Sequence, residues 1–215
     1  MIEPSAGIKP AASKEPAAPL NIGVLALQGA YDAHVKTLTA LGAKPRLVRV
    51  PKELEGLDGL IMPGGESTTM LKFLDRNGFF SILQAFVKTT PTFGTCAGAI
   101  LLATGVESPA QRSLAALDIT VERNAYGRQI DSTILTAETA LPGGPLEMVF
   151  IRAPRITHTG PAVETLATRD GYATLVRSGH LMAATFHPEL SHDHRVHQLF
   201  LDLVRQHPAH NSSTK

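Results

Sequence analysis

The sequence predicts an α/β protein with a mostly parallel twisted sheet, helices on both faces and additional antiparallel strands in the second half. Three observations support this fold class. Short apolar runs alternate with helix-like patterns through residues 21–103, an order typical of a parallel sheet. Residues 118–186 hold mostly strand-like runs and few helix signals. Finally, 43% of the 215 residues are apolar and 18% are charged, which excludes a disordered or fibrous chain.

The first half of the chain is expected to alternate strands with helices. The strands are short apolar runs with the composition of buried parallel strands, at residues 21–27, 46–50, 57–62 and 91–95. The helices show apolar residues at helical spacing, at residues 31–41, 67–74, 79–87 and 97–103. Gly42 is expected to end the first of these helices, and Ser67 to be the N-cap of the second.

The second half of the chain is expected to add strands, mostly antiparallel, to the same sheet. Strand-like runs occur at residues 118–123, 130–137, 147–151, 163–168, 173–176 and 181–186. A terminal amphipathic helix follows His192, because Val196, Phe200 and Val204 recur at helical spacing.

The composition also bounds the domain organisation and the compartment. Residues 1–20 are rich in Pro, Ala, Ser and Lys and are predicted to form a disordered tail, with a docking or targeting arm as the alternative. A single domain is expected over residues 21–207, followed by a frayed end at 208–215. The net charge of +1 gives no indication of a nucleic-acid or membrane partner. No apolar run reaches the ~20 residues of a membrane span, and the first twenty residues lack a secretory apolar segment.

The single cysteine stands in a pattern typical of a nucleophile. It excludes an internal disulfide and a cysteine-rich metal site, and it favours a reducing compartment, so we expect a cytoplasmic protein. The run Gly94-x-Cys96-x-Gly98 lies between a predicted strand and a predicted helix, which is the cysteine version of the G-x-Ser-x-G elbow. A thiol at a helix N-terminus is favoured as thiolate. The alternative is a buried structural cysteine.

A proton shuttle for this thiol is predicted at His187. This residue follows the strand at 181–186, and Glu189 stands two residues further on. In an extended chain, positions i and i+2 point the same way, so the carboxylate can orient the imidazole as the third member of a triad does. The alternative is a surface His-Pro turn before a helix.

Three further histidines, His192, His194 and His197, cluster near the start of the last helix. A metal site is one interpretation of this cluster. The chain has no HExxH pattern and no cysteine ligands, so a solvated helix face is favoured and no metal is predicted.

An oxyanion hole is expected from two loops. The Gly64-Gly65 pair allows backbone N–H groups to approach a substrate closely, and Ala97 follows the predicted nucleophile. We therefore assign Gly65 and Ala97 as the donors, each worth roughly 3–4 kcal/mol. A phosphate-binding loop is excluded because the Gly-x4-Gly-Lys-Ser/Thr spacing is missing.

Taken together, these motifs resemble those of the class I (triad-type) glutamine amidotransferases. More narrowly, residues 21–206 are similar to the family of glutaminase subunits of pyridoxal 5'-phosphate synthase. The similarity is carried by the stretches IGVLALQGAYDAH, LIMPGGESTTM, FGTCAGAILLA, VERNAYGRQIDS, VFIRAP and FHPELSHDHRVHQLF.

The resemblance implies a function for each matching position. Cys96, His187 and Glu189 would form the catalytic triad. The glutamine-binding residues would be Gly65, Glu66, Ser67, Arg123, Ile151 and Arg152. The family needs no cofactor, and its ammonia goes to a synthase subunit in a large mixed complex that makes pyridoxal 5'-phosphate. Two alternatives are a cysteine hydrolase of the same superfamily with another substrate and a non-catalytic thiol-sensing subunit.

Overall fold

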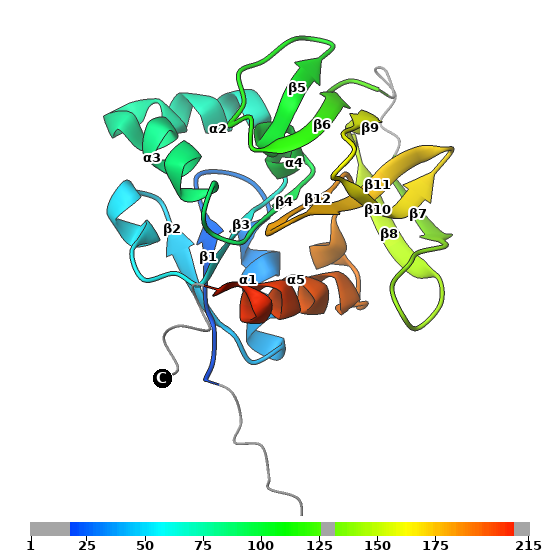
Figure 1. Cartoon of the computed structure of the whole chain (residues 1–215), viewed down its shortest axis with the longest axis horizontal. Helices are drawn as coiled ribbons and strands as arrows, with labels where there is room; N and C mark the ends of the chain where they lie inside the picture. Colours follow the sequence, from blue (N-terminus) through cyan, green and yellow to red (C-terminus); the bar gives the residue numbers. More distant parts are fainter. Residues whose placement is uncertain (1–17, 126–131, 209–215) are drawn as a thin grey trace, which may run out of the picture.

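A seven-stranded sheet forms the centre of the molecule (Figure 1). The computed structural model describes residues 18–125 and 132–208. In spatial order the strands are β10 (Glu164–Arg169), β11 (Tyr172–Ser178), β12 (Leu181–Ala184), β4 (Thr92–Thr95), β3 (Gly59–Met62), β1 (Asn21–Leu25) and β2 (Lys44–Val48). The five strands from β12 to β2 run parallel, and β11 is antiparallel to both of its neighbours. This arrangement confirms the predicted fold class.

Helices cover both faces of this sheet (Figure 1). On one face lie α1 (Tyr31–Ala40) and α5 (Arg195–Gln206), and on the other lie α2 (Ser67–Leu74), α3 (Phe79–Phe86) and α4 (Ala97–Leu102). Successive strand residues alternate between two apolar cores, as strand geometry requires. In β3, Ile61 packs on the α1/α5 side, whereas Leu60 and Met62 pack on the α2/α4 side.

The five strands β5 to β9 form two separate small sheets. One contains β5 (Ala103–Glu107), β6 (Leu117–Glu122) and β9 (Arg155–Thr159), and the other pairs β7 (Ser132–Ala137) with β8 (Leu146–Ile151). The described parts of the runs predicted at 118–123, 130–137 and 147–151 correspond to β6, β7 and β8, but these strands do not extend the central sheet as expected. The sequence analysis missed β5 and β9. Alternating apolar and polar residues predict that a segment is a strand. They do not predict which other strand it pairs with, because the tertiary fold decides that.

Several predicted boundaries differ from the structure at the ends of elements. The strands predicted at 21–27 and 181–186 end at Leu25 and Ala184, and the chain beyond them forms loops at the carboxyl edge of the sheet. Leu20, placed in the tail by composition, is buried, and its carbonyl accepts a hydrogen bond from Lys44 N. Residues 1–17, 126–131 and 209–215, which include most of the predicted tail and part of the ERNAYGRQ stretch, lie outside the described residues.

Three 3-10 helices complete the described elements: η1 (Pro51–Leu54), η2 (Arg76–Gly78) and η3 (Pro188–Leu190). Within residues 18–125 and 132–208, no helix has the length and apolar character needed to cross a membrane.

Candidate active site

Four neighbouring strands of the central sheet deliver residues of the site to one edge of that sheet. The loops after β12, β4, β3 and β1 carry His187, Cys96, the Gly64-Gly65 pair and Gln28 respectively. Register pairs such as Ala184 with Thr95 keep the ends of β12 and β4 level. Because the carboxyl ends of parallel strands share an edge, residues far apart in the sequence meet here.

Cys96 stands in a sharp turn between β4 and α4. Its backbone has φ 49° and ψ −104°, a positive-φ conformation that is strained for a residue with a side chain. Its N–H donates to the carbonyl of Ala184 in β12 (2.8 Å). A Cβ on Gly98 would overlap the carbonyl oxygen of Met62, so packing requires a glycine at that position. The turn has the geometry expected of a nucleophile elbow.

His187 lies between the thiol and a buried carboxylate. Its Nδ1 is 2.7 Å from Oε1 of Glu189, whose side chain is fully buried. The extended spacing on which the sequence analysis relied is wrong, because Glu189 lies in the 3-10 helix η3 and His187 is its N-cap. The short turn nevertheless directs the carboxylate back onto the imidazole.

Charge at this pair is set by burial and by hydrogen bonds. Burial of the ring acts to lower the pKa of His187, but hydrogen bonds to Cys96 and Glu189 outweigh it and raise the pKa to about 10. Burial likewise acts to raise the pKa of Glu189, but the neighbouring His34 and the hydrogen bond from His187 lower it below its ordinary value. At neutral pH the histidine is therefore an imidazolium that can donate a proton.

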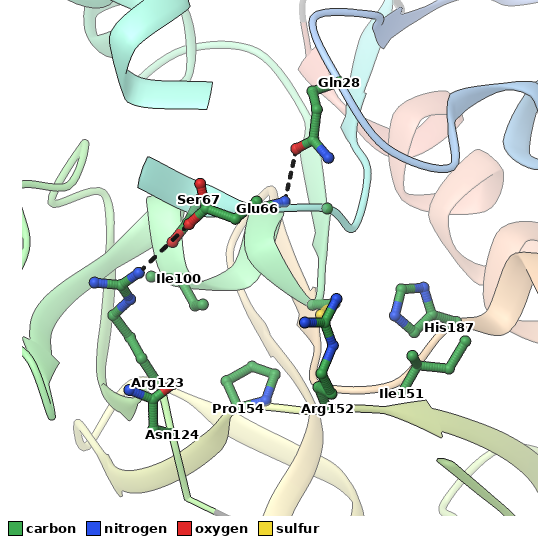
Figure 2. Close-up of a pocket in the computed structure, with 12 residues that line it drawn as sticks. Gln28, Glu66, Ser67, Ile100, Arg123, Asn124, Ile151, Arg152, Pro154 and His187 are labelled. Atoms are coloured by element: carbon green, nitrogen blue, oxygen red, sulfur yellow. Dashed lines mark hydrogen bonds and ion pairs between the residues drawn. The ribbon is translucent and has the colours of Figure 1, made fainter. Parts of the chain in front are cut away.

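A cavity of about 270 Å³ opens in front of this pair (Figure 2). The residues predicted from the sequence that line it are Cys96, His187, Gly65, Glu66, Ser67, Arg123, Ile151 and Arg152. Of the other two predicted residues, Glu189 lies behind His187, and Ala97 is the first residue of α4. In Figure 2, Arg152 projects between Arg123 and His187. Two guanidinium groups thus face a compartment large enough for a small polar molecule.

Glu66 lines the cavity at the start of α2. Its carboxylate accepts hydrogen bonds from the backbone N–H groups of Thr68 (3.1 Å) and Thr69 (2.7 Å) and from both hydroxyls. Glu66 is therefore the N-cap of α2, and the prediction that Ser67 caps this helix is wrong. Ser67 instead donates from its hydroxyl to Gln111 (2.9 Å). Arg123 approaches Glu66 at 3.8 Å, and its Nε is buried without a hydrogen-bond partner among the described residues.

The sequence analysis missed four lining residues, Gln28, Ile100, Asn124 and Pro154. The sequence does carry a signal for Gln28, because this residue follows a predicted strand whose carboxyl end lies at the same edge of the sheet as Cys96. Its Oε1 accepts a hydrogen bond from Glu66 N (2.6 Å), which ties the loop after β1 to the loop after β3 (Figure 2).

The interpretation of the histidine cluster as a solvated face is wrong for His197, which is buried. It shares the buried stripe of α5 with Phe200, Leu201 and Val204, at the spacing i, i+3, i+4 and i+7. Its ring contacts His34 of α1, a residue that carried no sequence signal. Among the residues that the structure describes, no three metal-ligating side chains come together.

A strained cysteine at a strand-to-helix turn, backed by a buried histidine and glutamate, defines the class of cysteine-dependent hydrolases with a triad. Comparison with known proteins identifies the family within this class. The chain belongs to the SNO glutamine amidotransferase family, which matches residues 24–206.

Relatives of known name cover nearly the same region. A Koribacter versatilis protein named pyridoxal 5'-phosphate synthase subunit PdxT is 61% identical over 186 residues, which cover 86% of this chain and 96% of the relative. PdxT proteins of Thermotoga maritima (46% identical, 86% and 100% covered) and Bacillus licheniformis (45%, 87% and 96%) are also similar.

Solved structures of glutamine amidotransferases are also similar to this chain. One described as a glutamine amidotransferase is 44% identical and aligns with a TM-score of 0.79, covering 85% of this chain and 98% of its own. A Thermotoga maritima glutamine amidotransferase, 12% identical, aligns with a TM-score of 0.54 over 91% of this chain and 86% of its own, which supports the fold alone.

Proposed function

We propose that this chain hydrolyses L-glutamine to L-glutamate and ammonia and delivers the ammonia to a pyridoxal 5'-phosphate synthase subunit, as part of vitamin B6 biosynthesis. The observation that carries the proposal is the line of Cys96, His187 and Glu189 at the cavity wall, in a chain 61% identical to a protein named for that synthase.

Cys96 supplies the nucleophile. Its sulfur attacks the side-chain carbonyl carbon of glutamine, and His187 donates a proton to the departing nitrogen, so that ammonia leaves and a γ-glutamyl thioester remains. His187, now neutral, takes a proton from water, and the hydroxide attacks the thioester to release glutamate. Glu189 remains ionised and holds the imidazole in place through its 2.7 Å hydrogen bond.

The negative oxygen of each tetrahedral intermediate needs donors. The backbone N–H groups of Gly65 and Ala97 fill this role in the proposal. Ala97 is the first residue of α4, where backbone N–H groups have no partner within the helix. Because amide dipoles and a thiol perform the chemistry, the reaction requires no metal or organic cofactor.

Glutamine carries an ammonium and a carboxylate beside its reacting amide. The cavity offers complementary charges, because the Glu66 carboxylate, with Arg123 3.8 Å away, and the guanidinium group of Arg152 all line it. Ile151 and Ser67 complete the binding surface.

The partner is the synthase subunit, because ammonia released into neutral water is protonated and lost as a nucleophile. Gly65 is exposed at the cavity mouth, and the Gly64 carbonyl accepts a long, 3.3 Å hydrogen bond from Ala30 N. A docked subunit can therefore reorient the Gly64-Gly65 peptide and complete the oxyanion hole. The cytoplasm belongs to the same proposal, since a thiol nucleophile must stay reduced.

The test is glutamate release from glutamine, with and without the cognate synthase subunit, for wild type, Cys96→Ala and Cys96→Ser. We expect release that the partner stimulates and that both substitutions abolish, although both variants still bind the partner. The serine variant controls for side-chain size, because its hydroxyl is a much weaker nucleophile.

Two results would contradict the proposal. Release that persists in Cys96→Ala would exclude Cys96 as the nucleophile. No release by folded wild type with an active partner would favour another substrate, or a thiol-sensing subunit that forms no γ-glutamyl thioester.

A further inference from the structure

Two histidines outside the predicted triad are buried directly behind it. His34, from α1, and His197, from α5, are both 0% exposed, and neither lines the substrate cavity. Burying a polar ring costs free energy unless its nitrogens are hydrogen-bonded, so the partners of these two rings indicate why they are buried here.

The contacts form a continuous line that ends at the thiol. His197 Nε2 lies 2.9 Å from His34 Nδ1. His34 Nε2 lies 3.4 Å from Oε2 of Glu189 and 3.2 Å from the hydroxyl of Thr95. The other carboxylate oxygen of Glu189 accepts from His187, which in turn hydrogen-bonds Cys96. Glu189 thus accepts a hydrogen bond from His187 at Oε1, whereas its Oε2 has no hydrogen-bond partner among the described residues and makes a 3.4 Å contact with His34 Nε2.

The chemistry of these groups fixes the direction of the hydrogen bonds. An ionised carboxylate only accepts, so the nearby Glu189 Oε2 favours the tautomer with the His34 proton on Nε2, which can also donate to the Thr95 hydroxyl. Burial lowers the pKa of His34 despite the opposing effect of Glu189, so the ring is neutral and its Nδ1 is an acceptor. His197 Nε2–H then donates to it, and His197 Nδ1 is left without a hydrogen-bond partner among the described residues. In this arrangement the His197 and His34 protons point toward Glu189 from one side, and the Nδ1 proton of His187 points toward it from the other.

We propose that His34, held in this tautomer by His197, is a positioning residue that fixes the Glu189 carboxylate against His187. Its kinetic consequence rests on the proposed glutaminase function. Oε2 of Glu189 has no hydrogen-bond partner among the described residues, so its 3.4 Å contact with His34 is what opposes rotation of the carboxylate away from the imidazole. An unpartnered nitrogen on His197 argues against a purely stabilising role, because an apolar pair would fill the same volume without that cost.

The kinetic test compares His34→Leu, His34→Gln and His197→Leu in complex with the synthase subunit. We expect His34→Leu to lower kcat for glutamate release by about tenfold or more, with KM nearly unchanged, because the substrate contacts are intact. His34→Gln retains an amide N–H able to reach Glu189 and should recover part of the loss. The matched control is His180→Leu, whose ring contacts Val87 O (3.0 Å) at the opposite edge of the sheet.

A second measurement needs neither glutamine nor the partner. The chain has one cysteine, so its rate of alkylation by iodoacetamide across pH reports Cys96 alone. We expect His34→Leu to slow alkylation at neutral pH by about threefold or more, because a loosened Glu189 stabilises the His187 imidazolium less well. The titratable groups that face His34 are Glu189, His187 and His197, and His194 faces His197. The pH profile is therefore recorded in the His197→Leu background as well.

The outcomes separate this inference from the proposed function. A folded His34→Leu variant with wild-type turnover and wild-type alkylation would overturn the positioning role, as would a slower variant whose alkylation profile is unchanged. If wild type releases no glutamate, the proposed function fails, while the alkylation comparison still decides the role of His34. If His34→Leu does not fold, His34→Gln and His197→Leu decide it by the same criteria.

Discussion

Gly64 and Gly65 show how single residues set the geometry of this site. A Cβ on Gly64 would lie 3.0 Å from His187 Nδ1 and 3.2 Å from Cys96 Cβ, so only a glycine lets the backbone approach both side chains. Gly65 has φ 155°, a conformation used almost only by glycine, and a Cβ there would lie 2.6 Å from Gln28 Oε1. The loop is therefore shaped by the absence of side chains.

At this scale we predict the effect of Gly65→Val. The substitution should leave the fold intact but lower kcat for glutamine hydrolysis by about 10²–10³-fold, the usual effect of losing one oxyanion donor. Gly56→Val is the matched control, because Gly56 also has a positive φ (70°) but nothing lies within 4 Å of its added Cβ. Steady-state kinetics with the synthase subunit present checks the prediction. Equal turnover in the two variants would exclude a role for the Gly65 amide.

Among the elements, α2 depends most visibly on one side chain. Glu66 caps its N-terminus through four hydrogen bonds from Thr68 and Thr69. Partial burial acts to raise the pKa of Glu66, but these hydrogen bonds outweigh it and lower the pKa from 4.5 to about 2. The same carboxylate faces the cavity, so the start of α2 is both a structural cap and a wall of the site.

This pKa shift predicts how stability changes in acid. Between pH 4.5 and about 2 the unfolded chain binds more protons at Glu66 than the folded chain does, so the stabilisation present above pH 4.5 is lost as the pH falls. Glu66→Gln should therefore be less stable than wild type at pH 7, by no more than about 1 kcal/mol for an exposed side chain. The difference should disappear near pH 2. Urea unfolding across this range, with the exposed Glu55→Gln as control, checks it, and a pH-independent difference would contradict it.

Across the whole molecule, Arg195 joins the last helix to a distant loop. Its guanidinium donates to the carbonyls of Pro142 (2.9 Å), Gly144 (2.8 Å) and Pro145 (2.7 Å), and Asp193 holds it in place (2.6 Å). That loop leads into β8, which ends at Ile151 beside the cavity. The planar guanidinium of Arg195 thus links the start of α5 to β8, the strand that ends at Ile151 and is followed directly by Arg152, two predicted substrate contacts.

Arg195→Lys tests this link. Lysine keeps the charge but cannot reach three carbonyls with a planar fork, so we expect a loss of about 1–3 kcal/mol in the free energy of unfolding. A higher KM for glutamine should accompany the loss, since β8 would be less firmly placed. Arg112→Lys is the control, because its ion pair with Asp75 is exposed and contributes little. Urea unfolding and steady-state kinetics measure both effects, and a variant as stable as the control would disprove the link.

The sequence alone predicts at which edge of the sheet the site lies. Apolar runs indicate parallel strands, and carboxyl ends of such strands share an edge, so Cys96, His187 and the Gly64-Gly65 pair could be placed together before any coordinates were known. The same local patterns identified nearly every strand and helix of the described chain.

Contacts between segments far apart in the sequence could not be predicted from local sequence patterns. Local periodicity does not encode which strand pairs with which, so the separate sheets of β5, β6 and β9 and of β7 and β8 were missed. Nor does it encode side-chain packing between helices, so His34 and His197, 163 residues apart, could not be paired. Motifs along the chain predict the reacting groups, whereas the burial and hydrogen bonds that set their charge exist only once distant elements have packed together.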